Sequence, residues 1–242
     1  MIATKLLSLA AAVLVGAGAA TAQQLRYMPF GDSITEIVCW RSKLWQRLRT
    51  TEWSTVDWVG SGRTENNCGD TQYDRDNEGH SGFLAINIAN QRQLVGWLQR
   101  NPADVITMHL GTNDINQGRS VNDITAAFTT LVRDMRASNP RMKIIVAQII
   151  PIAFGNANTQ IQNLNRAIVP WAQGLNTTES PIWVVDQYTG FGTSDLRDGV
   201  HPSNSGDEKM ANVWYPAIIR AFETARADKL AQLAAPDIPS AA

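Results

Sequence analysis

Three short polar segments contain residue types that together can perform nucleophilic catalysis. They are Gly-Asp-Ser at 31–33, Gly-Thr-Asn-Asp at 111–114 and Asp-Gly-Val-His at 198–201. A serine hydroxyl becomes a nucleophile when a histidine accepts its proton, and a carboxylate can fix the tautomer and orientation of that histidine. We therefore take Ser33, His201 and Asp198 as the candidate nucleophile, general base and orienting carboxylate.

The middle segment adds a group that can stabilise negative charge. A neutral amide donates hydrogen bonds to an oxyanion without itself acting as an acid, and Asn113 is the candidate for that role. Taken singly, each segment has an ordinary explanation, such as a helix N-cap at 31–33 or an exposed turn at 198–201. Their joint presence favours catalysis, although the G-x-S-x-G motif of α/β-hydrolases does not occur.

Strands that alternate with helices must position these segments. Short apolar runs predict strands at 25–30, 56–61, 104–110, 143–150 and 182–186. Helical periodicity predicts helices at 41–50, 86–100, 121–137, 159–175 and 206–233. This order predicts one three-layer α/β/α domain with a mostly parallel sheet of about five strands. The loops at the carboxyl ends of such strands carry function, which is where the three segments fall.

Composition excludes several other classes of protein. The 242 residues include 21 basic and 22 acidic side chains, so the formal net charge of −1 offers no footprint for nucleic acid. No cluster of Cys and His has zinc-finger spacing, and no repeat or interdomain linker divides the chain.

The first 22 residues have the pattern of a secretory signal peptide. Lys5 precedes an apolar run at 6–15, and Ala20-Thr21-Ala22 matches an A-x-A cleavage site. The alternative, a short membrane anchor, is disfavoured because the apolar run is too short to span a bilayer. We expect a secreted, extracellular protein with its domain at 23–233, followed by a frayed, disordered tail at 234–242.

Export also bears on the two cysteines and on one asparagine. In an oxidising compartment Cys39 and Cys68 are expected to form a disulfide, with two buried free thiols as the alternative. Asn176 begins the sequon Asn-Thr-Thr and is therefore a candidate for glycosylation.

The three polar segments resemble the sequence blocks of the SGNH (GDSL-type) hydrolase superfamily. The resemblance covers nearly the whole mature chain and implies a flavodoxin-like SGNH hydrolase fold with Ser33, Asp198 and His201 as its catalytic residues. It also implies an oxyanion hole formed by the backbone N–H groups of Ser33 and Gly79 together with the Asn113 amide. Gly82 is an alternative to Gly79.

Further segments resemble the fungal-type acetyl xylan esterases of carbohydrate esterase family 3. They are 28–36, 39–41, 76–83 and 183–186. This resemblance implies removal of O-acetyl groups from plant cell-wall polysaccharide, xylan in particular, through an acyl-enzyme. It implies no metal and no organic cofactor. The expected partner is the acetylated polysaccharide, with no nucleic acid and no membrane, and the expected state is a monomer.

Several other residues compete for functional roles. Ser81, between two glycines, is a rival nucleophile, and His80 a rival base, whereas His109 is expected to belong to the core. Trp40 is expected either to stack on a sugar or to pack internally. The acidic segment 74–79 begins like an EF-hand loop but has Ala85 at the position of the bidentate glutamate, so we predict a surface loop.

Two further functions remain alternatives at this point. A lipase, thioesterase or esterase for small esters would use the same catalytic residues. A polysaccharide-binding module without activity would not need Ser33, Asp198 and His201, so their presence argues against that class.

Overall fold

The computed structural model describes residues 24–234, and a parallel sheet forms its centre. The long strands are β1 (Arg26–Gly31), β4 (Val105–His109), β5 (Lys143–Gln148) and β6 (Ile182–Asp186). With the short strand β2 (Asp57–Trp58) at one edge, the sheet has the order β2-β1-β4-β5-β6, and every pairing is parallel. The predicted signal peptide lies outside the described residues, as does the predicted tail apart from Ala234, which ends the last helix.

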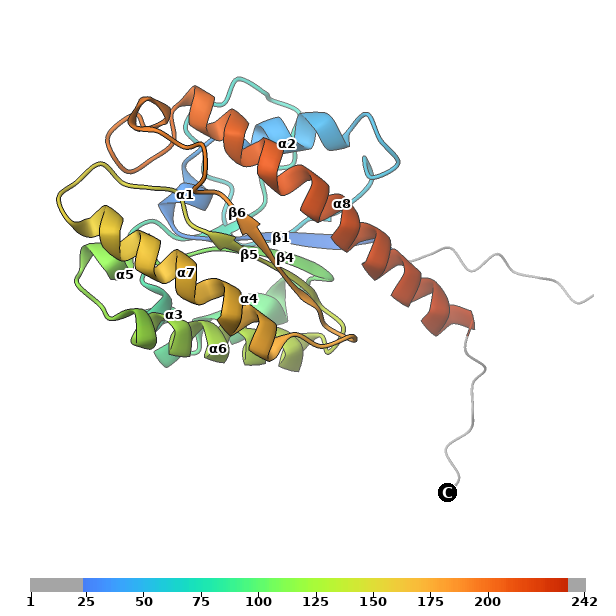
Figure 1. The fold of residues 1–242 in the computed structure, drawn as a ribbon. Helices are drawn as coiled ribbons and strands as arrows, with labels where there is room; N and C mark the ends of the chain where they lie inside the picture. The colour runs from blue at the N-terminus through green and yellow to red at the C-terminus, as the bar shows by residue number, and fades with distance from the viewer. Residues whose placement is uncertain (1–23, 235–242) are drawn as a thin grey trace, which may run out of the picture.

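Helices cover both faces of the sheet (Figure 1). The helices α2 (Trp40–Leu48) and α8 (Asn204–Ala234) pack on one face. The other face is covered by α3 (Ala85–Asn90), α4 (Gln93–Arg100), α6 (Val121–Ser138) and α7 (Ala157–Leu175). Along β5, Ile144 and Val146 enter one hydrophobic cluster while Ile145 and Ala147 enter the other, because successive strand side chains point to opposite faces. The predicted three-layer α/β/α fold is confirmed.

Three elements differ from the sequence prediction. The helix predicted at 86–100 is divided into α3 and α4, because Arg92 adopts the left-handed conformation with φ of 52°. The strand predicted at 56–61 contains only the two residues of β2 (Asp57–Trp58). A further two-residue strand, β3 (Glu78–Gly79), was not predicted and pairs with β1.

Strand register gathers the polar segments at one end of the sheet. Gly31, the last residue of β1, is paired with His109 of β4 on one side and with Gly79 of β3 on the other. Two short helices follow at this end, α1 (Ser33–Glu36) after β1 and α5 (Thr112–Asn116) after β4 (Figure 1). Within the described residues, no helix has both the length and the apolar character needed to cross a membrane.

Candidate active site

Ser33 is the first residue of α1, held there by a tight turn. A Cβ on Gly31 would lie 2.2 Å from Thr35 Oγ1 and 2.7 Å from the His109 carbonyl oxygen, so the turn requires glycine. Asp32 is the N-cap, and its Oδ1 accepts the Ile34 N–H at 2.9 Å. Burial raises the pKa of Asp32 to about 7 despite that hydrogen bond. Asp32 thus shapes the turn that presents Ser33.

The structure brings the three predicted catalytic side chains together. His201 Nε2 lies 2.8 Å from Ser33 Oγ, although the two residues are 168 positions apart. On the other side of the ring, His201 Nδ1 lies 2.8 Å from Asp198 Oδ2. Because an ionised carboxylate only accepts hydrogen bonds, Nδ1 must carry the proton in this pair, which leaves Nε2 free to accept the Ser33 proton.

Asp198 is held in its ionised form. Burial tends to raise its pKa, but hydrogen bonds from the backbone and ring of His201 and from the Val200 N–H outweigh burial and lower the pKa to about 2. Its Oδ1 accepts both backbone N–H groups, at 2.8 Å from His201 and 3.0 Å from Val200. The turn between carboxylate and imidazole passes through Gly199, whose φ is 86°. Asp198 can therefore orient the imidazole across the neutral pH range.

Gly79 packs against α1, the helix that begins with Ser33, but its N–H already has an acceptor. That N–H donates to Asn77 Oδ1 at 2.9 Å. A Cβ at this position would lie 2.5 Å from the Glu36 backbone nitrogen, so α1 can pack against β3 only because residue 79 is glycine. Packing alone explains this glycine, and its role in an oxyanion hole stays a prediction. At Gly82, φ is 80° and an added Cβ would meet no atom within 4 Å.

Asn113 lies on α5, directly after the carboxyl end of β4. Gly111, with φ of 115°, ends the strand and starts this short helix. The Asn113 amide donates to the Phe83 carbonyl oxygen at 3.0 Å, and a primary amide has a second N–H that this bond does not use. Asp114 accepts the N–H groups of Ala85 and Ile86, which joins α5 to the start of α3.

Two carboxylates that the sequence analysis missed hold the segment 78–82. Glu36 Oε2 accepts both the N–H and the hydroxyl of Ser81. Glu78 is fully buried, and its Oε1 lies 2.8 Å from His80 Nε2 and accepts the Ser61 hydroxyl at 2.6 Å. The contact between Glu78 and His80 could have been inferred from the sequence. Their i, i+2 spacing places both side chains on one face of a strand.

The other residues considered for functional roles, Ser81, His80 and Trp40, do not contact Ser33, His201 or Asp198 through the hydrogen bonds and ring contacts that they make. Ser81 bonds to a glutamate and no histidine, and the His80 ring packs against both Phe83 and Trp97, with centroids 5.0 and 4.1 Å away. Trp40 is buried and its Nε1 donates to the Ile34 carbonyl oxygen at 2.7 Å, so the sugar-stacking alternative for Trp40 is wrong.

The predicted core position of His109 is confirmed. Its side chain is buried, and its Nε2 accepts the Ile150 N–H at 3.3 Å. Burial lowers the pKa of His109 to about 3, so this imidazole is neutral at physiological pH.

The predicted disulfide is confirmed. Cys39 is bonded to Cys68, which ties the N-terminus of α2 to the loop between β2 and β3. Asp207 of α8 caps the same helix, because its Oδ1 accepts the N–H groups of Cys39 and Trp40 at 3.0 Å each. Asn176 is exposed at the C-cap of α7, and its glycosylation stays a prediction.

The prediction of a surface loop at 74–79 is wrong, because 77–79 is buried and Glu78–Gly79 forms β3. The carboxylates of this segment are used within the protein. Asp74 accepts the N–H groups of Trp58 and Asp76, and Arg63 pairs with Asp76. Across residues 24–234 no group of three or more His, Cys, Asp or Glu side chains is arranged to hold a metal ion.

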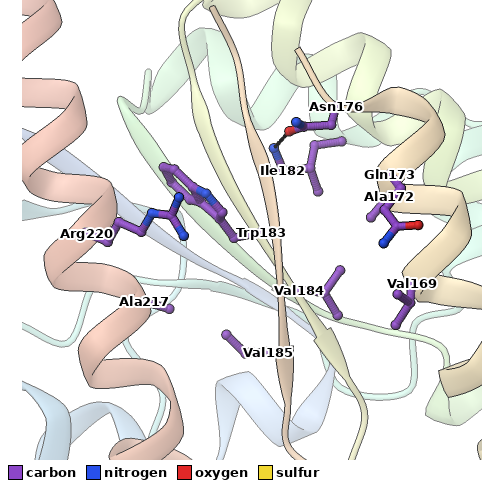
Figure 2. A pocket seen from close by; sticks show the side chains of 10 residues that line it. All are labelled: Val169, Ala172, Gln173, Asn176, Ile182, Trp183, Val184, Val185, Ala217 and Arg220. Atoms are coloured by element: carbon purple, nitrogen blue, oxygen red, sulfur yellow. Dashed lines mark hydrogen bonds between the residues drawn. The ribbon is translucent and has the colours of Figure 1, made fainter. Parts of the chain in front are cut away.

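Two pockets lie at different distances along the chain from Ser33, His201 and Asp198, the three residues that we call the triad. One, of about 380 Å³, lies along the edge strand β6 between α7 and α8, with the Arg220 guanidinium 4.8 Å from the Trp183 ring centroid (Figure 2). None of its lining side chains belongs to the triad. The other, of about 340 Å³, is likewise lined by none of Ser33, Asp198 and His201, but it borders their loop through Arg197 and Pro202. Polar side chains line much of this second pocket, among them Lys43, Gln46, Asn66, Asn67, Ser203 and Asn204.

Comparisons with known proteins agree with this geometry. The sequence profile of the GDSL-like Lipase/Acylhydrolase family matches residues 30–209. A multidomain esterase from Ruminococcus flavefaciens is 26% identical over 219 residues, which cover 80% of this chain and 28% of the relative. The chain thus spans about a quarter of that relative's length.

Similar solved structures include a carbohydrate esterase family 3 protein from Talaromyces cellulolyticus and an acetyl esterase mutant with acetate ion. Each is 39% identical with a TM-score of 0.79, and each match covers 83% of this chain and 99% of the other. A family 3 carbohydrate esterase from Clostridium thermocellum is 26% identical with a TM-score of 0.69, and the match covers 84% and 100% of the two chains.

Proposed function

Because the chain belongs to the GDSL-like lipase/acylhydrolase family, we propose that it is a secreted serine esterase that removes O-acetyl groups from acetylated xylan. The chain is an esterase of the SGNH type and is similar to acetyl esterases of carbohydrate esterase family 3. Secretion is supported by the signal-peptide pattern at 1–22 and by the disulfide.

One observation carries the proposed mechanism. The continuous hydrogen-bonded series from Ser33 Oγ through the His201 ring to Asp198 has the geometry of a nucleophile, its base and an orienting carboxylate. Both contacts measure 2.8 Å, within the range for efficient proton transfer.

The reaction follows from these three groups. Ser33 Oγ attacks the carbonyl carbon of the acetyl ester while His201 Nε2 takes the hydroxyl proton. The tetrahedral intermediate collapses when His201 returns that proton to the sugar oxygen, which releases the deacetylated sugar and leaves acetyl-Ser33. Water then attacks the acetyl carbon while His201 takes the water proton. The second tetrahedral intermediate collapses with cleavage of the bond to Ser33 Oγ, His201 returns the proton to Oγ, and acetate leaves.

The proposed oxyanion donors belong to three elements at the end of the sheet where Ser33 lies. They are the N–H of Ser33 at the start of α1, the N–H of Gly79 on β3 and the amide of Asn113 on α5. Fixed donors aimed at the position where charge develops are a large contribution to acyl transfer. For Gly79, the proposal requires the oxyanion to share or replace the acceptor Asn77 Oδ1.

The surroundings of the triad favour a hydroxylated substrate. The pocket beside the His201 loop is lined by amides, hydroxyls, the cations Lys43 and Arg197 and the Asp207 carboxylate, which suit sugar hydroxyls and not a fatty acyl chain. Xylan is proposed as the polymer because of the similarity to the family 3 carbohydrate esterases.

The test is a comparison of esters that differ in acyl length and alcohol. We expect acetate release from acetylated xylan, and faster hydrolysis of p-nitrophenyl acetate than of the butyrate and octanoate. Equal or faster hydrolysis of the octanoate would favour a lipase. Hydrolysis of p-nitrophenyl acetate with no acetate released from the polymer would favour an esterase for small esters. A Ser33→Ala protein provides the background rate.

A further inference from the structure

An exposed phenylalanine lies next to the catalytic loop. Phe154, in the segment between β5 and α7, exposes 54% of its surface. Two leucines, Leu230 and Leu233, are the other large apolar side chains with comparable exposure among residues 24–234, and both belong to the last turns of α8. Single exposed apolar side chains are common, so the meaning of Phe154 depends on its neighbours.

Those neighbours belong to the triad loop. The Ala153 N–H donates to the Gly199 carbonyl oxygen at 2.8 Å, which fastens the segment containing Phe154 to the turn between Asp198 and His201. A Cβ on Gly199 would lie only 2.5 Å from Phe154 Cζ, so the ring packs directly over the glycine. The aromatic side chain is therefore fixed one residue from the carboxylate and two residues from the base.

The ring retains surface for another contact after this packing. More than half of Phe154 is still exposed, and burying apolar surface is favourable by about 25 cal/mol per Å². A pyranose presents a face of C–H bonds, and the aromatic face, with its negative quadrupole, is a suitable partner for such hydrogens. The polar pocket bordered by Arg197 supplies partners for hydroxyl groups near the same loop.

We propose that Phe154 is a specificity-determining residue that stacks against a pyranose ring of the polysaccharide while an acetyl group of that polymer lies at Ser33. This inference rests on the proposed deacetylation of a polysaccharide. It assigns to the aromatic ring a contact with the sugar, distinct from the chemistry performed by the triad.

The test compares Phe154→Ala with wild type on a polymer and on an ester without a sugar. For acetylated xylan we expect KM to rise about threefold to tenfold, with kcat little changed, because stacking contributes to binding. For ethyl acetate we expect kcat/KM within about twofold of wild type, since no ring contacts residue 154. Ethyl acetate is preferred to a nitrophenyl ester, whose own aromatic ring could contact the phenylalanine.

Two further variants keep the result interpretable. Phe154→Trp should retain the wild-type KM for the polymer because it keeps an aromatic face, and Leu230→Ala is a matched control that removes an exposed apolar side chain far along α8. Equal losses on both esters would mean that the ring only supports Gly199, and unchanged kinetics on both would mean that it contacts no sugar. Either result overturns the inference and leaves the proposed function intact. Wild-type protein that releases no acetate from the polymer would overturn the proposed function itself, and this inference with it.

Discussion

The two sides of the candidate active site differ in how their hydrogen bonds are arranged. On the base side, His201 is hydrogen-bonded to Ser33 through Nε2 and to Asp198 through Nδ1. The groups that transfer the proton are therefore aligned before an ester binds. On the oxyanion side, Gly79 donates to Asn77 Oδ1 and Asn113 donates to the Phe83 carbonyl. In the structure, those two donors form hydrogen bonds that stabilise the loops around the site.

The difference has a physical cause. A buried N–H without an acceptor raises the free energy of the folded protein. An oxyanion exists only during the reaction, so between reactions its donors are best satisfied by acceptors of the protein. The nucleophile and its base avoid this difficulty because each satisfies the other. We therefore expect substitutions on the base side to remove nearly all activity and substitutions on the oxyanion side to cause graded losses.

The largest effects are expected for the nucleophile and the base. Ser33→Ala and His201→Ala should each lower kcat on p-nitrophenyl acetate by about 10⁶ fold, because the two groups act as one unit. Circular dichroism and the urea unfolding midpoint should stay close to wild type, since neither Ser33 nor His201 belongs to the hydrophobic core. Ser81→Ala is the control and should retain activity within a few fold.

The next effect concerns the orienting carboxylate. Asp198→Asn should lower kcat by about 10⁴ fold, less than His201→Ala, because the imidazole remains but loses its orientation and the charge beside it. With the pKa of Asp198 at about 2, the carboxylate is ionised throughout the range in which histidines titrate.

The pH profile sharpens this prediction. In wild type, kcat/KM should fall as the pH decreases because protonated His201 is no longer a base. Asp198, whose pKa is about 2, should stay ionised throughout this fall. The same fall in the residual activity of His201→Ala would contradict the assignment of His201 as the base.

A smaller effect is expected for the oxyanion amide. Asn113→Ala should lower kcat by about 10² to 10³ fold with little change in KM, because an oxyanion donor acts mainly in the transition state. Asn116→Ala is the matched control, since Asn116 is an exposed asparagine on the same short helix. A KM effect without a kcat effect would place the Asn113 amide in substrate binding instead.

The smallest effect is on stability and concerns Asp207 of α8, which caps the N-terminus of α2. Burial raises the pKa of Asp207 from 3.8 to about 7, although the N–H groups of Cys39 and Trp40 lower it. The folded protein thus holds this proton more tightly than the unfolded chain, and the stability from this group is lost as the pH rises towards 7. Asp207→Asn keeps an acceptor for both N–H groups and removes this loss.

The expected result is a pH-dependent difference between the two proteins. Relative to wild type, the free energy of unfolding of Asp207→Asn in urea should increase by roughly 1 to 3 kcal/mol between pH 4.5 and 7.5. The buried His109 acts in the opposite direction in this range, because its pKa is lowered, but it contributes equally to both proteins. A difference that does not vary with pH would show that Asp207 does not titrate there.

The sequence predicted those parts of the fold that local patterns determine. Apolar runs located β1, β4, β5 and β6, and helical periodicity located α6 and α7, because each has a buried face of regular period. The strand β3 could not be predicted, since Glu78–Gly79 has no apolar pattern and becomes a strand only by pairing with β1. Likewise, the break between α3 and α4 falls at Arg92, a residue type that rarely adopts positive φ, whereas the nearby Gly96 lies inside α4.

The candidate site was predictable to a similar extent. The residue types at 31–33 and 198–201 pointed to a serine, a base and a carboxylate, while their 2.8 Å contacts depend on the assembled sheet. The carboxylates Glu36 and Glu78 were missed because their partners, Ser81 and Ser61, are 45 and 17 residues away. Trp40 could not be assigned from sequence, because only the packing of α2 against α8, where Trp40 contacts Trp214, shows that it is buried.

The central claim is that Ser33 is the nucleophile, and covalent labelling tests it most directly. Wild-type protein would be treated with a fluorophosphonate, and the modified residue would be identified by peptide mass spectrometry. We predict one adduct on Ser33, no adduct in Ser33→Ala, and slower labelling in His201→Ala because the base no longer takes the serine proton. An adduct on Ser81, or labelling of Ser33→Ala at the wild-type rate, would contradict the account.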